Sequence, residues 1–302
     1  MMNNILITGG TGLIGMKLSE LLTSKGYQVA HLTRNKQQNP KFKQFEWDIA
    51  NEVIEDGALK FAHVIIHLAG AGVADKRWTA ERKQTIIESR TKSADLLFKE
   101  LQKEKEHTVQ QFISASAIGY YGMYTGNTLL REDHKSGDDF LAEVVVKWEN
   151  AADQFQSLGL PVSKLRVGVV LAKEGGALPQ LAKPIKLGVG AALGSGDQYM
   201  SWVHIDDICQ MFLHLLENNL NGTFNGVAPQ PVTNKEMTKA VANELDKPLW
   251  LPNVPGFVMK LVLGEMAGIV LGGNKVSSEK IIDTDYVYVH PELKEAISTI
   301  YN

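Results

Sequence analysis

Three glycines near the N-terminus, Gly9, Gly12 and Gly15, recur at intervals of three residues. A short apolar run at residues 5–8 precedes them, and a helical pattern at residues 13–25 follows. In this setting the glycines permit a tight turn, a close ligand approach and close helix–strand packing. The helix start then offers unpaired N–H groups and partial positive charge to phosphates. The spacing predicts a dinucleotide pyrophosphate site whose contacts are Gly9, Thr11, Gly12, Leu13, Ile14 and Gly15.

The second strand of this unit, residues 27–33, is followed by Arg34 and not by an acidic residue. An Asp or Glu there would bind the ribose hydroxyls of NAD, whereas arginine can pair with a 2′-phosphate and stack on adenine. Arg34 therefore favours NADP(H) over NAD(H) as the cofactor. The alternative, that Arg34 is a solvated loop residue, stays open at this point.

Two further strand ends add candidate cofactor contacts. Asp48 follows a weaker strand at residues 43–47 and is a candidate partner for the adenine amino group. A continuous apolar strand at residues 64–68 leads into Ala69 and Gly70, which would let the cofactor backbone pass closely. We therefore add Leu68, Ala69 and Gly70 to the predicted cofactor site.

The elements that must position these residues are short apolar strands that alternate with helical patterns. Continuous apolar strands indicate burial on both faces, and alternation with helices indicates a parallel sheet. The sequence predicts an α/β fold with a doubly wound parallel sheet of the Rossmann type. We expect a dinucleotide-binding domain at residues 1–171, with a contribution from about 200–228. A smaller, interleaved lobe is expected at residues 172–302, where glycines cluster after residue 174.

Composition and charge limit the classes of partner that the protein is expected to bind. The chain has 302 residues, 44% of them hydrophobic, and a net charge of −3, which argues against nucleic acid and acidic membrane surfaces. The single cysteine, Cys209, lies in an apolar stretch and fits a reducing cytosol as a buried hydrophobe.

No signal peptide pattern is present, so we expect a cytoplasmic monomer or homodimer. Residues 257–273 are apolar but are interrupted by Lys260 and Glu265, which predicts a buried or interface helix and no membrane span.

Several motifs resemble the extended short-chain dehydrogenase/reductase superfamily, in its NAD-dependent epimerase/dehydratase branch. Besides the glycine loop, the resemblance rests on His67-Leu68-Ala69-Gly70, Ser114-Ala115-Ser116 before Tyr121-Gly122, and Trp202-Val203-His204-Ile205-Asp206-Asp207. It implies a nicotinamide cofactor and a small polar substrate, for which a nucleotide sugar is the superfamily default. His204 is interpreted as a residue that positions the smaller lobe.

The chain is more similar still to an atypical subgroup of uncharacterised epimerase family oxidoreductases. The shared segments are Arg77-Trp78, Glu88-Ser89-Arg90, residues 114–122, Trp148-Glu149, Gly175-Gly176-Ala177-Leu178 and Gly194-Ser195-Gly196-Asp197-Gln198. A C-terminal module characteristic of that subgroup is expected at about residues 248–302. The resemblance places Ser89 at the cofactor and Arg77, Trp78 and Gly176 in the substrate pocket.

The catalytic residues of the superfamily carry over only in part. Its members usually use a serine and a Tyr-x-x-x-Lys pair on one helix face, where lysine lowers the pKa of the tyrosine for proton exchange with substrate. Aligned on Glu149, Leu141 and Val145 stand at these two positions, and neither can titrate. Lys147 points about 200° around the helix from Val145.

The catalytic candidates that remain are Ser116, Tyr120 and Tyr121. Ser116 stands where the superfamily has its serine, and either tyrosine is a candidate proton donor or a packing residue. No His, Cys, Asp and Glu cluster has metal-ligand spacing in the sequence, so no metal is expected. Two functions stay open: an NADP(H)-dependent oxidoreductase or epimerase acting on an unknown small polar substrate, and an NADP(H)-binding regulatory or partner-binding protein.

Overall fold

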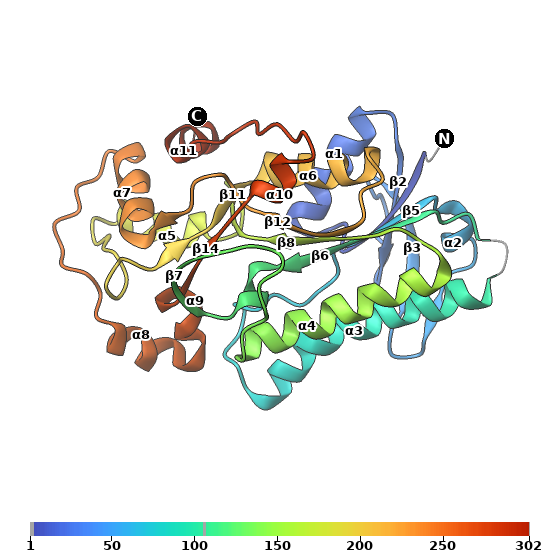
Figure 1. The fold of residues 1–302 in the computed structure, drawn as a ribbon, viewed down its shortest axis with the longest axis horizontal. Coiled ribbons are helices and arrows are strands. Elements are labelled where there is room, and N and C mark those ends of the chain that lie inside the picture. The colour runs from blue at the N-terminus through green and yellow to red at the C-terminus, as the bar shows by residue number, and fades with distance from the viewer. Residues whose placement is uncertain (1–2, 105–106, 302) are drawn as a thin grey trace.

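The computed structural model describes residues 3–104 and 107–301. Its central sheet contains β1 (Asn4–Thr8), β2 (Gln28–Thr33), β3 (Lys43–Asp48), β4 (Val53–Ile54), β5 (Val64–His67), β6 (Gln111–Ala117), β8 (Val162–Val167) and β12 (Gly222–Gly226). The strand order is β12-β8-β6-β5-β1-β2-β3-β4. Neighbouring strands are parallel, except that β4 runs antiparallel to β3 at one edge. The predicted doubly wound parallel sheet is confirmed (Figure 1).

Helices cover both faces of this sheet. On one face lie α1 (Leu13–Ser24) and α6 (Ile205–Glu217), and on the other lie α2 (Ala58–Phe61), α3 (Ala80–Lys103) and α4 (Phe140–Asp153) (Figure 1). Ile5 and Ile7 of β1 pack into the core with α1 and α6, while Leu6 packs into the opposite core. Strict alternation of side chains along a strand explains why β1 is apolar throughout.

The predicted strand at residues 162–171 is divided by Gly168 into β8 and β9 (Val169–Leu171). The N–H of Gly168 still donates to Gly226 of the central sheet at 3.0 Å. A Cβ atom on Gly168 would lie 2.4 Å from the Ser201 oxygen, so the backbones approach too closely for a side chain. β9 then leaves the central sheet and pairs with β11 (Trp202–His204), which carries the chain into the smaller lobe.

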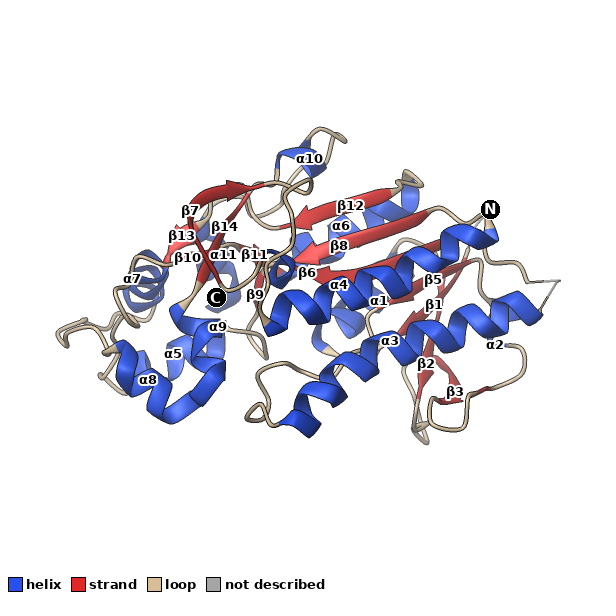
Figure 2. Ribbon diagram, turned by 60° about the horizontal axis from the view of Figure 1, so that its bottom comes forward, coloured by secondary structure: helices blue, strands red, loops and turns tan. Residues whose placement is uncertain are grey.

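The smaller lobe has its own apolar core among α5 (Leu178–Lys186), α7 (Asn234–Glu244) and α11 (Leu293–Tyr301). Two more small sheets pair β10 (Tyr199–Met200) with β13 (Val232–Thr233), and β7 (Tyr124–Leu130) with β14 (Gly273–Val276). Further short helices are η1 (Ile118–Tyr121), η2 (Gln154–Leu158) and α10 (Glu279–Ile282). The carboxyl ends of β6, β8 and β12 point towards this lobe (Figure 2), and ligands bind outside the carboxyl ends of the strands in folds of this kind.

The prediction of a single helix at residues 257–273 is wrong. The segment forms α8 (Gly256–Leu263), η3 (Gly264–Met266) and α9 (Ala267–Leu271), because Gly264 turns the chain with a φ of +60°. The described residues of α8 include no buried side chain, and Phe257 is 72% exposed. None of the helices in the described part of the chain combines the length and apolarity needed to span a bilayer.

Candidate functional site

The glycine loop forms a tight turn between β1 and α1. Gly9 has a φ of +68°, and its carbonyl oxygen accepts a hydrogen bond from the N–H of Gly12 at 3.0 Å. A Cβ atom on Gly15 would lie 2.3 Å from the same oxygen, so a side chain at this position would force the turn apart. Among the described residues, no side chain caps α1 and its first turn holds no acidic residue. The first N–H groups of α1 are therefore available to an anion.

The end of β5 lies directly against this turn. A Cβ atom on Gly9 would lie 2.9 Å from the carbonyl carbon of Leu68. The hydroxyl oxygen of Thr8 accepts hydrogen bonds from the N–H groups of Leu68 and Ala69 at 3.1 and 3.2 Å. The structure thus brings together two of the segments that were predicted separately to contact a dinucleotide.

Two other predicted contacts also lie near the loop. The side chain of Leu13 faces the Gly175–Gly176 turn, where a Cβ atom on Gly175 would be 3.2 Å from Leu13 Cδ2. Ile14 is partly buried and Thr11 is exposed. The Leu13 contact joins the cofactor loop to Gly176, a residue predicted for the substrate pocket.

A buried guanidinium stands beside the strand end at Gly70. A Cβ atom on Gly70 would lie 2.9 Å from Arg90 Cζ. One amino group of Arg90 donates to the carbonyl oxygens of Ala71 and Ile86 at 3.0 and 2.9 Å, and its Nε finds no partner among the described residues. Burial, followed by the charge of Arg82, lowers the pKa of Arg90 to about 10. Ser89 is tied to the same loop, since its hydroxyl oxygen accepts from Ala71 N–H at 2.9 Å.

The ends of β2 and β3 present Arg34 and Asp48 very differently. Arg34 is exposed, and within the described residues its guanidinium has no ion-pair partner. The Asp48 carboxylate accepts hydrogen bonds from the N–H groups of Ala50 and Asn51 at 2.9 and 3.1 Å. The Asn51 side-chain amide donates to the same carboxylate at 2.7 Å, and this bond, followed by the backbone bonds, lowers the pKa of Asp48. Asp48 thus shapes its own turn, while Arg34 is available to a ligand.

Ser116 lies in a buried polar network at the end of β6. Its hydroxyl donates to Glu149 Oε1 at 2.6 Å. Arg166 of β8 binds both carboxylate oxygens of Glu149, with Nε at 2.8 Å and Nη2 at 2.9 Å. Ser116, Glu149 and Arg166 are at most 5% exposed. The bidentate geometry satisfies two buried charges at once.

The two candidate tyrosines differ in their surroundings. Tyr121 is 4% exposed, its hydroxyl donates to Asn225 at 2.8 Å, and it accepts from Arg166 at 3.0 Å. Burial raises the pKa of Tyr121 to about 12. Tyr120 is half-buried, its ring lies 3.4 Å from the Arg166 guanidinium, and its hydroxyl has no hydrogen-bond partner in the described part of the chain. Tyr120 is therefore the tyrosine whose hydroxyl can meet a ligand.

The face of α4 where the superfamily carries tyrosine and lysine is apolar. Leu141 and Val145 pack against η1, where a Cβ atom on Gly119 would lie 3.4 Å from Leu141 Cβ and 3.8 Å from Val145 Cγ2. Lys147 forms an exposed ion pair with Glu143 one turn away, at 2.6 Å. The Lys147 ammonium thus belongs to the helix surface.

Arg77 and Trp78 lie on a loop that reaches the C-terminal module. Arg77 donates to the carbonyl oxygen of Leu261 at 3.3 Å. The indole N–H of Trp78 donates to Val73 at 2.8 Å, and its ring meets Phe140 edge-on. Of these two predicted substrate contacts, Arg77 bridges the lobes and Trp78 is partly buried at the start of α4.

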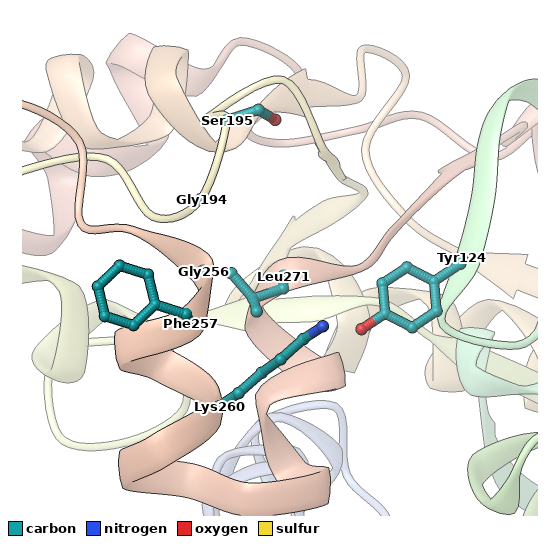
Figure 3. Close-up of a pocket in the computed structure, with 7 residues that line it drawn as sticks. All are labelled: Tyr124, Gly194, Ser195, Gly256, Phe257, Lys260 and Leu271. Atoms are coloured by element: carbon teal, nitrogen blue, oxygen red, sulfur yellow. The ribbon is translucent and has the colours of Figure 1, made fainter.

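A pocket of about 440 Å³ opens in the smaller lobe (Figure 3). Its lining comes from β7, the turn at residues 194–195, α8 and the end of α9: Tyr124, Gly194, Ser195, Gly256, Phe257, Lys260 and Leu271. Sequence reasoning missed this pocket, since its walls come from segments far apart in the chain.

His204 lies in a second cluster that sequence spacing did not reveal. His204, Asp206 and His290 hold potential ligand atoms within 4.8 Å of one another, although the sequence separates His290 from the other two. His204 Nδ1 already accepts from the Asp206 N–H at 3.1 Å as the N-cap of α6, and Lys17 pairs with Asp206 at 3.0 Å. Burial, followed by the neighbouring His290, lowers the pKa of His204 to about 4. These contacts make His204 and Asp206 part of the start of α6, while His290 Nδ1 is buried without a hydrogen-bond partner among the described residues.

Glu149, Arg166 and Asn225 are the site residues that sequence reasoning did not select. A signal was present for Arg166, because a charged residue inside an apolar strand must find a partner when that strand is buried. Nothing in the spacing identifies Glu149 as that partner. Cys209 is buried as expected, and burial raises the pKa of its thiol.

Proteins of known sequence or structure resemble this chain over nearly its whole length. It is 33% identical to the epimerase family protein YfhF of Bacillus subtilis, over 98% of this chain and 97% of YfhF. It is 31% identical to the human epimerase family protein SDR39U1 (isoform 2), whose crystal structure contains NADPH, with a TM-score of 0.85 over 98% of each chain. UDP-glucuronic acid 4-epimerase from Bacillus cereus, solved with UDP-glucuronic acid and NAD, shares the fold at 18% identity with a TM-score of 0.78, over 99% of this chain and 98% of that one.

Two family descriptions cover most of the chain. Residues 5–226 match the NAD dependent epimerase/dehydratase family, and residues 254–300 match a domain of unknown function, DUF1731. The resemblance seen in the sequence motifs, including a separate C-terminal module, is thereby confirmed. With the glycine loop, the parallel sheet and these matches together, the chain belongs to the NAD-dependent epimerase/dehydratase family.

Proposed function

We propose that this protein binds NADP(H) along residues 9–15 and uses it in an oxidoreductase or epimerase reaction on a small polar substrate. The observation that carries the proposal is the uncapped start of α1, which follows a turn that glycines keep open. Such a helix terminus binds phosphate through its N–H groups and its dipole. The NADPH in the SDR39U1 structure supports the same choice of ligand.

Arg34 is the basis for preferring NADP(H). It is exposed at the end of β2, where the 2′ position of an adenosine ribose is expected in this fold. Its guanidinium can form a bidentate pair with a phosphate, which NADH lacks. Lys36 is less suited to this role, because it is already paired with Glu55.

Arg90 supplies a second positive charge close to the proposed cofactor. Its guanidinium lies beside Gly70, and Gly70 follows the strand that touches the glycine loop. A buried guanidinium without a carboxylate partner is costly, and an anionic ligand would reduce that cost. The Nε–H of Arg90, which has no partner among the described residues, is a donor available for such a ligand.

For acid–base chemistry the structure favours Tyr120 over Tyr121 and Ser116. A bound nicotinamide supplies or accepts a hydride, and a protein group must then give or take the proton of the substrate oxygen. The hydroxyls of Ser116 and Tyr121 are committed to the Glu149–Arg166 network. Tyr120 is held by the face of its ring against Arg166, which leaves its hydroxyl available for this proton transfer.

A second candidate function is NADP(H)-dependent regulation or partner binding. The specific observation in its favour is the apolar contact of Leu141 and Val145 with η1, where related enzymes place their titrating pair. A protein of this kind would bind the cofactor tightly and turn nothing over.

The test measures binding and turnover separately. NADPH binding is followed by nicotinamide fluorescence, and turnover by the loss of nicotinamide absorbance with a panel of carbonyl compounds and nucleotide sugars. If the protein is an enzyme, Tyr120→Phe should retain NADPH binding and lose turnover. Tight binding without turnover across the panel would favour the regulatory role, and absence of NADPH binding would refute both.

Tyr121→Phe is the matched control for Tyr120→Phe. It should lower the stability by about 1–3 kcal/mol, because Asn225 and Arg166 lose a buried partner. The Tyr120→Phe variant removes a hydroxyl without a partner in the described structure, so its stability should stay close to that of the parent protein. Loss of turnover in Tyr121→Phe alone would overturn the assignment of Tyr120.

A further inference from the structure

The pocket in the smaller lobe carries an unneutralised positive charge. In Figure 3 the side chains of Lys260 on α8 and Tyr124 on β7 extend towards each other, with the ammonium and the hydroxyl at their facing ends. None of the seven lining residues is acidic. Within the described residues no carboxylate lies at ion-pair distance from Lys260. Glu265, the acidic residue of the neighbouring η3, is already paired with Lys83.

Two glycines of the pocket wall, Gly194 and Gly256, lie close to Leu271. A Cβ atom on Gly194 would lie 3.0 Å from Leu271 Cδ2, and one on Gly256 would lie 3.6 Å from Leu271 Cδ1. Gly194 has a φ of +60°, which a side chain rarely tolerates. The side chain of Asn253 donates to the carbonyl oxygens of residues 194 and 195 at 3.2 and 2.8 Å and so fixes this turn. The Asn253 side chain thus fixes one wall of the pocket.

The other lining residues and the pocket volume indicate the size and apolar character of a ligand. Leu271 presents apolar surface beside Lys260 and Tyr124, whereas the side chains of Phe257 and Ser195 point away from this pair in Figure 3. The Ser195 hydroxyl oxygen accepts the Asp197 N–H at 3.1 Å within its own turn. A volume of about 440 Å³ is within the range that small-molecule ligands occupy in proteins. A lysine ammonium is a compact cation, and a tyrosine O–H can donate to the same oxygen.

We propose that this pocket binds a small organic anion, with its charged oxygens on Lys260 and Tyr124 and its apolar body against Leu271. The anionic oxygen is common to carboxylates and phosphate esters, and the geometry requires only that chemistry. The inference goes beyond the proposed redox function, because the pocket is built from the smaller lobe and needs no nucleotide for its charge or shape.

The experiment titrates the full chain, without nucleotide, with benzoate, phenyl phosphate and benzamide, followed by ligand-observed NMR. Benzamide keeps the ring of benzoate and removes its charge. At least one of the two anions should bind, about tenfold or more tightly than benzamide, and Lys260→Met should weaken that anion about tenfold. Whichever anion binds more tightly distinguishes a carboxylate ligand from a phosphate ester.

Lys239→Met is the matched control, because Lys239 is an exposed lysine on α7 outside the pocket lining. It should leave anion binding unchanged, and Tyr124→Phe should weaken it. Both Lys260 and Tyr124 are exposed, so these variants should fold, which a thermal melt checks. Failure of both anions to bind at millimolar concentration, equal binding of benzamide, or unchanged binding in Lys260→Met would each overturn the proposal. None of these results depends on whether NADPH binds.

Discussion

The Ser116 hydroxyl donates to Glu149 Oε1 at 2.6 Å, and Arg166 binds both oxygens of the same carboxylate. The serine that the superfamily uses with substrate is here bound to a buried ion pair. The contact joins the end of β6 to α4 and β8, the elements that frame the crevice. Its first consequence concerns stability.

Replacing Glu149 with alanine should destabilise the protein by about 3–5 kcal/mol, because Arg166 would remain as a buried charge without its partner. Urea denaturation measures the change. Glu143→Ala is the control on the same helix, since it breaks only the exposed pair with Lys147 and should cost about 0.5 kcal/mol or less. Similar losses of unfolding free energy in the two variants would contradict the conclusion that the buried Glu149–Arg166 pair stabilises the protein more than the exposed Glu143–Lys147 pair.

Gly15→Ala should abolish or strongly weaken NADPH binding. The new methyl group would lie 2.3 Å from the Gly9 carbonyl oxygen and would push the turn away from the start of α1. Fluorescence titration with NADPH measures the loss. Gly256→Ala is a matched change in the other lobe, where the new methyl group would make only ordinary contact at 3.6 Å, and it should leave NADPH binding unchanged.

The sequence predicted those parts of the fold and site that depend on local pattern. The apolar run of β1 followed by Gly9, Gly12 and Gly15 defines a strand, a turn and a helix start without any distant partner. The sequence did not predict the contacts between distant segments. Glu149 and Arg166 meet across two elements, and only the packing of α4 onto β8 selects that pairing.

The wrong predictions also arise because local sequence pattern does not show backbone turns and distant contacts. Residues 257–273 have the composition of one apolar helix, yet Gly264 adopts a positive φ and the chain turns there. Apolar composition predicted a buried or interface helix, and of these two alternatives burial within the chain is wrong for α8, where Leu261 is 79% exposed. The pocket around Lys260 depends on Tyr124 from a distant strand, so no local pattern could indicate it.

Arg34→Ala should weaken NADPH binding about tenfold or more and leave NADH binding nearly unchanged, because only NADPH carries the 2′-phosphate that Arg34 would pair with. Parallel titrations with both nucleotides measure the ratio. Lys36→Ala should change neither affinity much, since Lys36 is engaged by Glu55. An equal loss for NADPH and NADH in Arg34→Ala would refute the assignment of the 2′-phosphate to this residue.

Stability should fall as the pH drops from 6.5 towards 4, partly because of His31 beneath the glycine loop. His31 is 1% exposed, and burial lowers its pKa from 6.5 to about 4. Ser19 donates its hydroxyl to Gly15, so the His31 Nε2–H donates to Ser19 at 2.8 Å. The lowered pKa keeps the His31 ring neutral near pH 6.5. The unfolded chain binds this proton below pH 6.5 while the folded chain does not, so acid favours unfolding across that window.

The His31 contribution can be isolated with His31→Gln, which keeps an N–H donor for Ser19 and removes the titrating ring. Denaturation at pH 7 and pH 5 measures the pH effect above the range where most carboxylates titrate. The drop in unfolding free energy between these values should be about 1–2 kcal/mol smaller in His31→Gln than in the parent protein. Part of the drop should persist in the variant, because burial also lowers the pKa values of His67 and His204. An identical drop in both proteins would contradict the lowered pKa of His31 in the folded protein.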